Sequence, residues 1–208
     1  MRLILASTSP RRREILALLG LPFETVDPDF TEIPSEGRPI DREVVAFAAG
    51  KAASVSIAHP GAVVIGSDTM IRVGEKKLGK PKNISDARRM LLDLGGKSHR
   101  IYTAVAIVDG AGGPGLRVVE EVAVRMGAYS EGEVDDYLSY GESLDKAAAY
   151  SIQGRGRALI ESIEGDYLAA VGLPLRPIAQ YLKSRDVDLP VDIEKLYAEK
   201  SYRNWNSF

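Results

Sequence analysis

The sequence predicts an α/β protein, and three features of the chain support this fold class. The chain opens with a strand, a tight turn and a helix; a second helix then leads into another buried strand; two long β-rich runs are followed by further helices. Of the 208 residues, 45% are hydrophobic and 27% are charged, which is enough apolar material for a sizeable core. The length suits one large domain or two small lobes.

The first strand is predicted to lead directly into a helix N-terminus. The short apolar run at residues 3–6 predicts a buried strand, and Ser7-Thr8-Ser9 ends it. Ser9 is a good N-cap, and Pro10 suits the first helical position, where no amide donor is needed. The helix should end at Gly20 and bury Ile15, Leu16, Leu18 and Leu19.

The later elements follow from apolar periodicity and from capping or turn residues. We expect strands at 23–26, 62–65 and 159–163, a hairpin turn at 74–77, and helices at 41–57, 86–94, 130–141, 174–183 and 193–200. Ser85 is expected to cap the helix at 86–94, and Ser130 with Glu133 forms a capping box. The runs 99–108 and 117–128 predict an antiparallel hairpin around the glycine-rich residues 109–115.

Composition excludes several classes of site and partner. The chain has no cysteine, which excludes disulfides and thiolate chemistry, and its two histidines are far apart in sequence, so we expect no zinc site. A net charge of -2 argues against a broad basic surface for nucleic acid. Neither a signal peptide nor an apolar run long enough for a bilayer is present, so we expect a cytoplasmic protein without a membrane partner.

The segment from Ser7 to Arg13 has the features of an anion site. A helix N-terminus offers unpaired amide donors and a partial positive charge, which together favour phosphate. Three arginines, Arg11, Arg12 and Arg13, lie in the first turn, where positive charge is unfavourable unless an anion compensates it. The alternative is a solvated charged face. We interpret the segment as a phosphate site with Ser7, Arg11 and Arg12 as ligands.

Four further charged residues are candidates for the same site, and each has an ordinary structural alternative. Asp68 lies in Gly66-Ser67-Asp68-Thr69, directly after a buried strand, and this segment predicts a turn. The turn can be a ligand-binding strand end or a simple Asx-turn. Residues 70–73 can also continue the strand. Lys51, on the apolar helix face, can snorkel, and Lys80 can be a surface loop cation. Glu32, in an extended loop, can be an ordinary solvated acid; with Asp68 it offers hard oxygen ligands for a magnesium ion that bridges substrate phosphates.

Gln153 lies in a glycine-rich segment, residues 150–156, where the backbone can approach a flat ligand or pack tightly on a neighbour. Its amide offers one donor and one acceptor group, which match the N3–H and O4 edge of uracil or thymine. A pyrimidine base is therefore a candidate ligand for this segment.

Six short motifs, taken in order, resemble the Maf family of nucleoside triphosphate pyrophosphatases. The resemblance runs from about residue 3 to about residue 182 and includes Leu5-Ala6-Ser7-Thr8-Ser9-Pro10-Arg11-Arg12, Gly66-Ser67-Asp68-Thr69, Gly79-Lys80-Pro81, Tyr102-Thr103, Ser151-Ile152-Gln153-Gly154, and Gly165-Asp166-Tyr167 with Gly172-Leu173-Pro174. One departure is Ala147-Ala148-Ala149-Tyr150-Ser151, where the family more usually has Ala-Gly-Ala-Tyr-Gly.

The resemblance implies an elongated, two-lobed mixed sheet with flanking helices and a central cleft, built as one Maf-like domain over residues 1–208. It also implies a divalent metal, Mg or Mn, and hydrolysis of a nucleoside triphosphate to the monophosphate and pyrophosphate. Asp68 matches the catalytic proton acceptor, and Glu32, Lys51 and Lys80 match positions of the phosphate and metal site. Three positions that separate the dTTP/UTP branch from the 7-methyl-GTP branch have dTTP/UTP identities here: Arg11, Thr69 and Gln153.

Some alternatives stay open on the sequence. Asp68 can serve chiefly as a general base or chiefly as a metal ligand. A regulatory protein that binds nucleotide without hydrolysis and a purine-directed house-cleaning triphosphatase are competing functions. Residues 186–208 form a C-terminal extension that matches no motif, and Tyr202 and Trp205 can pack on the body of the protein or on a second subunit of a homodimer.

Overall fold

The computed structural model describes residues 1–208 except 36, 111 and 113–114. The chain forms two compact units. The first unit contains Met1–Thr69, Tyr102–Glu120 and Leu168–Lys200, and the second contains Met70–Ile101, Glu121–Tyr167 and Ser201–Phe208. Each unit is described separately below.

The strands form one mixed sheet, which confirms the predicted α/β class with flanking helices. In the described residues the hydrogen-bonded order is β2-β1-β3-β5-β6-β7, and β4 pairs with β3. β1 is parallel to β2 and β3, whereas β4 is antiparallel to β3 and β7 is antiparallel to β6. The bounds are β1 (Leu3–Ala6), β2 (Glu24–Val26), β3 (Val63–Val73), β4 (Lys76–Leu78), β5 (Ser98–Asp109), β6 (Leu116–Met126) and β7 (Ile160–Glu164).

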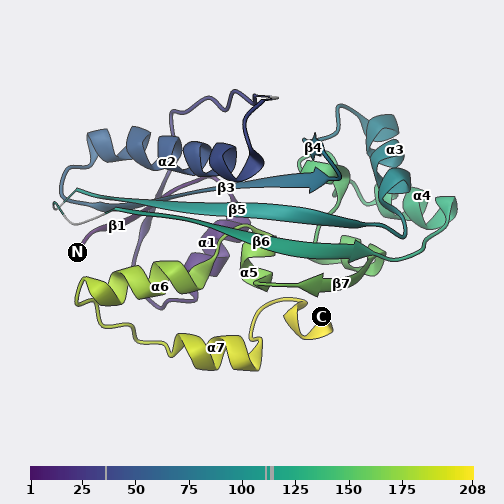
Figure 1. Ribbon diagram of the computed structural model, residues 1–208. Helices are drawn as coiled ribbons and strands as arrows, with labels where there is room; N and C mark the ends of the chain where they lie inside the picture. Colours follow the sequence, from purple (N-terminus) through teal and green to yellow (C-terminus); the bar gives the residue numbers. More distant parts are fainter. Residues whose placement is uncertain (36, 111, 113–114) are drawn as a thin grey trace. The chain divides into compact units, whose positions relative to one another are not determined.

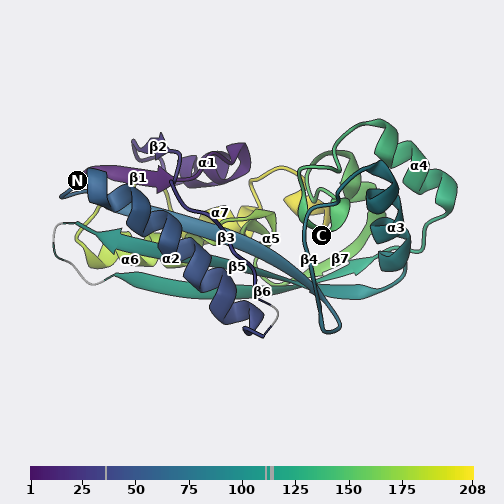
Figure 2. The same ribbon diagram turned by 90° about the horizontal axis from the view of Figure 1, so that it is seen from above.

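In the first unit, helices lie on both sides of the strands. Figure 1 shows α2 (Ile40–Ala58) on one side and α6 (Leu175–Ser184), followed by α7 (Ile193–Glu199), on the other; Figure 2 shows α2 running over β3. α1 (Pro10–Ala17) follows β1, and α5 (Tyr167–Val171) precedes α6. Small buried side chains let α2 approach the sheet closely, and its Ala52 and Val55 pack with Ile4, Ala6, Ala62 and Val64.

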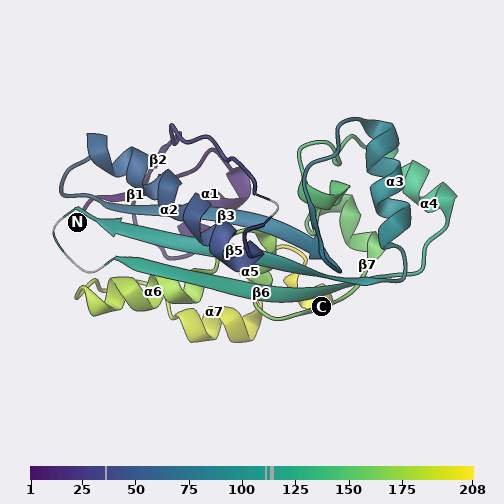
Figure 3. The same cartoon turned by 45° about the horizontal axis from the view of Figure 1, so that its top comes forward.

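The second unit combines the short β4 and β7 with two helices and several 3-10 turns. α3 (Ile84–Leu94) and α4 (Glu131–Ser139) are neighbours (Figure 3), and Arg88 of α3 pairs with Glu131 and Asp135 of α4. The 3-10 turns are η1 (Ala147–Ala149), η2 (Gly154–Leu159) and η3 (Trp205–Ser207).

Most local predictions are confirmed by the structure. Ser9 caps α1 by accepting a hydrogen bond from the Arg12 amide, and Pro10 occupies the first helical turn. Ser130 and Glu133 form the predicted capping box of α4. Figure 3 also shows β5 and β6 as neighbouring strands that run in opposite directions, as predicted for the hairpin. The predicted connection covers residues 109–115, of which 111 and 113–114 lie outside the described residues.

Two local predictions are wrong, and one short helix was not predicted. Gly66-Ser67-Asp68-Thr69 is not a turn, because β3 continues through it to Val73 and Gly66 pairs with Ala6 of β1. Asn83, rather than Ser85, caps α3, because the Asn83 side chain accepts the Asp86 amide. The short helix α5 was not predicted, since five residues leave almost no periodicity to detect.

The segment beyond Arg185 divides between the units. In the first unit, the Arg176 guanidinium of α6 pairs with Glu194 and lies over the Tyr197 ring of α7. In the second unit, Trp205 stacks on Tyr167. None of the helices in the described ranges has the length and apolar composition that crossing a membrane requires.

Candidate active site

In the first unit, the carboxyl end of β1 lies beside residues 66–69 of β3. β1 and β3 are parallel neighbours, and Ala6, the last residue of β1, pairs with Gly66 of β3. Ser7 and the N-terminus of α1 therefore lie level with Ser67, Asp68 and Thr69. After β1 the chain continues to β2, which pairs with one side of β1, whereas β3 pairs with the other side of β1. Ligands of α/β sheets bind in crevices at the carboxyl ends of strands with this kind of divergence.

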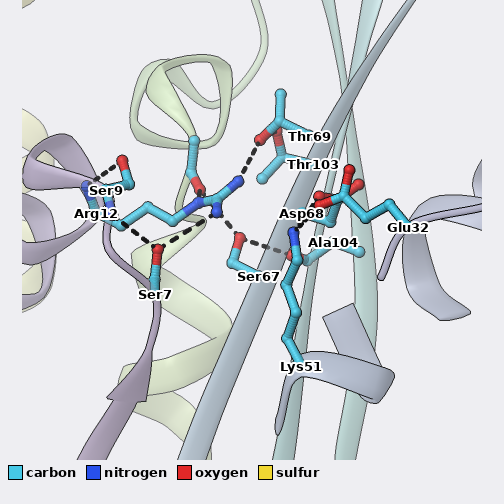
Figure 4. Close-up of polar contacts among 11 residues, drawn as sticks. Ser7, Ser9, Arg12, Glu32, Lys51, Ser67, Asp68, Thr69, Thr103 and Ala104 are labelled. Atoms are coloured by element: carbon cyan, nitrogen blue, oxygen red, sulfur yellow. Dashed lines mark hydrogen bonds and ion pairs between the residues drawn. The ribbon is translucent and has the colours of Figure 1, made fainter. Parts of the chain in front are cut away.

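Side-chain alternation along β3 separates the site into two clusters. Successive residues of a strand point to opposite faces, so Gly66 and Asp68 share one face and Ser67 and Thr69 share the other. Figure 4 shows the result: Asp68 meets Lys51 and Glu32, whereas Thr69 meets Arg12.

The first cluster consists of Glu32, Lys51 and Asp68. The Lys51 ammonium lies 2.6 Å from an Asp68 oxygen and 2.5 Å from a Glu32 oxygen. Lys51 and Asp68 are buried, while the Glu32 side chain is 47% exposed. Lys51 therefore does not snorkel to solvent: it neutralises part of the charge of two carboxylates that would otherwise repel each other.

Gly66 explains how Lys51 reaches this position. A Cβ atom on Gly66 would lie 2.3 Å from the Ala48 carbonyl oxygen and 2.7 Å from the Ala52 amide nitrogen of α2. Only glycine permits α2 to pack this close to β3, and Lys51 projects from this part of the helix.

The surroundings shift the pKa values of the two carboxylates in opposite directions. Burial raises the pKa of Asp68, and the nearby charges of Lys51 and Arg12 oppose that rise only in part. Burial is also the largest single influence on Glu32 and acts to raise its pKa, but the interactions with Lys51, Asp68 and Arg12 together hold this pKa below its usual value. The site thus favours the anionic form of Glu32 and the protonated form of Asp68, each relative to the ordinary carboxylate.

The second cluster is centred on Arg12. Its Nε donates to the Gly172 carbonyl at 2.9 Å, one Nη donates to the Thr69 hydroxyl at 3.3 Å, and the other approaches the Ser7 hydroxyl at 3.5 Å. Three of the five guanidinium N–H groups are directed at protein acceptors, so two remain for a phosphate. Arg12 therefore has two roles: it supplies positive charge, and it connects α1 to β3 and to the turn at Gly172.

Two members of this cluster were present in the recognised motifs but had no predicted role. Ser67 is fully buried, and its hydroxyl lies 2.8 Å from the Ala104 carbonyl and 3.0 Å from the Gly172 carbonyl. The Thr103 hydroxyl of β5 lies 3.1 Å from that of Thr69. Their signal in the sequence is a small hydroxyl side chain within an otherwise apolar buried strand, where it needs a partner.

Arg11 differs from Arg12 in its surroundings. It lies on the first turn of α1, half-buried, and within the described part of the chain its side chain has no hydrogen bond or ion pair. Its charge remains available to a ligand at the helix N-terminus. Arg13 is exposed, which agrees with a solvated side chain.

The other two predicted site residues belong to the second unit. Lys80 is exposed in the loop after β4. Gln153 is half-buried immediately before η2, and its amide nitrogen is buried without a hydrogen-bond partner among the described residues. A buried donor without a partner is costly, so this nitrogen is suited to a ligand acceptor.

The carboxylate pair fits a hard divalent cation. The described residues contain no group of three or more His, Asp or Glu side chains able to hold a metal. Glu32 and Asp68 nevertheless both direct a carboxylate oxygen at the Lys51 ammonium, which balances part of their negative charge. Magnesium is commonly bound by one or two carboxylates together with waters and substrate phosphates, so this donor set is sufficient.

Comparison with known proteins agrees with this geometry. The Maf-like protein family matches residues 2–185. A dTTP/UTP pyrophosphatase of Symbiobacterium thermophilum is 44% identical over 87% of this chain and 92% of its own length. A protein of the same name from Moorella thermoacetica is 42% identical, and the match covers 90% of this chain and 97% of that protein. Another from Myxococcus xanthus is 41% identical, and the match covers 90% of this chain and 94% of that protein. A match of this extent is decisive: the chain belongs to the Maf-like protein family.

Proposed function

We propose that this protein hydrolyses dTTP and UTP to the nucleoside monophosphate and pyrophosphate. Similar proteins named dTTP/UTP pyrophosphatase align with about nine tenths of the chain. The observation in the structure that carries the proposal is the Asp68 carboxylate, buried on β3 beside Lys51 and level with the N-terminus of α1.

In the proposed reaction, Asp68 orients a water molecule and accepts its proton as the water attacks phosphorus. Burial favours the protonated form of Asp68, which makes proton acceptance easier, while Lys51 keeps the carboxylate available before the step. No covalent intermediate is needed, because hydrolysis of a phosphoanhydride depends mainly on positioning and on charge stabilisation.

The phosphate chain is proposed to bind at the N-terminus of α1. The Ser7 hydroxyl, the Arg11 backbone amide and the Arg11 side chain supply donors and positive charge, and Arg12 adds its two remaining N–H groups. Lys80 is proposed as a further phosphate ligand. When bound, a Mg or Mn ion held by Glu32 and Asp68 would neutralise phosphate charge.

Selection of the base is proposed to involve Gln153, with Arg11 and Thr69. The unpartnered amide nitrogen of Gln153 can donate to a pyrimidine carbonyl oxygen, and its amide oxygen can accept N3–H. We further propose a cytoplasmic location, where nucleoside triphosphates are made, and no nucleic-acid partner, since the net charge is -2. A monomer and a homodimer both fit these proposals.

The decisive variant is Asp68→Asn, which keeps the shape of the side chain and removes its basicity. Loss of a general base lowers turnover by about 100- to 10,000-fold, so pyrophosphate release from UTP should fall by at least the lower factor. Asp93→Asn, at an exposed position of α3, is the matched control and should leave turnover unchanged. Near wild-type turnover of a folded Asp68→Asn protein would refute the proposed role.

Product analysis separates the competing functions. Incubation with UTP, dTTP and ITP in the presence of Mg or Mn should yield UMP and dTMP with little IMP. Tight binding without product would instead favour a regulatory protein. Equal rates on ITP and UTP would leave the reaction in place but remove the pyrimidine preference. Addition of a chelator should abolish turnover if the proposed metal is required.

A further inference from the structure

Residues 201–208, the terminal segment, are held in the second unit by an aromatic contact. Trp205 is buried, and its ring stacks on that of Tyr167 with 5.5 Å between centroids and 14° between planes. The Tyr167 hydroxyl also donates to the Arg203 carbonyl at 2.6 Å. The segment is thus an integral layer of this unit, although it lies beyond residue 185, where the family match ends.

Arg157 makes a second connection between the terminal segment and the unit. One Nη donates to the Ser207 carbonyl at 3.0 Å, and the guanidinium carbon lies 4.5 Å from the centroid of the Phe208 ring. The other Nη approaches the Ile160 carbonyl at 3.3 Å. Arg157 therefore ties the terminal segment to the end of η2 and the start of β7.

Gln153 lies at the opposite end of the same 3-10 turn. It is the residue immediately before η2, and only three residues separate it from Arg157. The first turn is held by Glu142, whose carboxylate accepts the Arg155 amide at 3.2 Å. A 3-10 turn rises by about 2 Å per residue, so displacement of Arg157 shifts the backbone that carries Gln153.

We propose that the terminal segment is a positioning element for Gln153 and thereby contributes to nucleotide-base selectivity. The proposal rests on the proposed function for the identity of the ligand. Its physical basis is that a buried, unpartnered amide recognises a base only when it is held in place. The terminal segment supplies one attachment of η2, in addition to those of Arg155 to Glu142 and Tyr140 and of Leu159 to Gly127.

The test is a double-mutant cycle in the full chain. Trp205→Ala removes the stack on Tyr167, and Trp205→Phe, the matched control, keeps an aromatic ring. Each is made alone and together with Gln153→Ala, and kcat and KM are measured for UTP and ITP. Binding of a non-hydrolysable UTP analogue to the same variants provides a second readout.

If the terminal segment acts through Gln153, Trp205→Ala should raise KM for UTP about three- to ten-fold, which lies in the lower part of the range for residues coupled in one network. Its kcat should stay within about two-fold, because the proposed base, Asp68, belongs to the first unit. Selectivity for UTP over ITP should fall by the same factor as KM rises. In the Gln153→Ala background, Trp205→Ala should cause no further loss, and Trp205→Phe should restore most of the affinity.

Equal losses from Trp205→Ala with and without Gln153, or an unchanged UTP/ITP ratio, would overturn the proposal. Phe208→Ala removes the ring that lies beside both Arg157 and Tyr167 and leaves the Trp205 stack in place, so it tests the same connection if Trp205→Ala unfolds the protein. It should lower the UTP/ITP ratio, whereas Phe208→Tyr should not. Failure of the proposed function is a different result, since wild-type protein would then release no UMP. The binding cycle would still decide whether the segment acts through Gln153.

Discussion

At the scale of single residues, Arg12 shows what a sequence can and cannot reveal about a charged side chain. The dipole argument identifies the first turn of α1 as an anion site and does not distinguish Arg11 from Arg12. The distinction comes from partners that are 57 and 160 positions away, Thr69 and Gly172. Such distant contacts leave no pattern in the local sequence. The same holds for Lys51, whose two carboxylate partners become visible only in the folded chain.

Lysine substitution should separate the two arginines. Arg12→Lys loses the planar fork that serves Gly172 and Thr69 together, so we expect a loss of about 1–3 kcal/mol in the free energy of unfolding. Arg11→Lys removes no contact within the protein and should change stability by less than about 0.5 kcal/mol. Urea denaturation of both variants measures the difference. Equal stabilities would show that the Arg12 contacts contribute little.

At the scale of elements, prediction succeeded where the determinants are local. The N-cap of α1 and the capping box of α4 each depend on residues at most three positions apart, and both were predicted correctly. Prediction failed at residues 66–69, whose small and polar side chains are typical of a turn. There the outcome is decided by pairing with β1 and by packing under α2, which are long-range effects.

Gly66→Ala should disturb the packing of α2 on β3. The added methyl group would overlap backbone atoms of Ala48 and Ala52, so the helix must move, at a cost of about 1–3 kcal/mol of stability. Movement of α2 also displaces Lys51 from Asp68, and turnover of UTP should therefore fall. Gly37→Ala is the control, because a Cβ atom added at Gly37 would have no described atom beyond its chain neighbours within 4 Å. It should retain both stability and turnover. A fully active Gly66→Ala protein would contradict the proposed role of this close approach.

At the scale of the whole molecule, a buried histidine links stability to pH. His99 of β5 lies 2.7 Å from the Tyr150 hydroxyl through Nε2, and its Nδ1 is buried without a partner among the described residues. Burial lowers the pKa of His99 to about 4. Between pH 6.5 and 4 the unfolded chain therefore binds the proton more readily than the folded chain, and stability must fall as the pH falls.

The size of this effect can be measured by replacing His99. The difference between the ordinary pKa and about 4 corresponds to about 3 kcal/mol of stability that is present above pH 6.5 and lost by pH 4. His99→Gln should flatten the pH dependence of the free energy of unfolding across this window. His59→Gln, which alters a histidine outside the core, should not. Parallel curves for wild type and His99→Gln would contradict a neutral, buried His99.

The division of the chain between the two units has a consequence for inheritance and engineering. The described chain passes from one unit to the other five times, after Thr69, Ile101, Glu120, Tyr167 and Lys200. The first three passages lie inside β3, β5 and β6. Neither unit is therefore encoded by one contiguous stretch of the gene. Recombination therefore cannot exchange one whole unit between relatives with a single crossover.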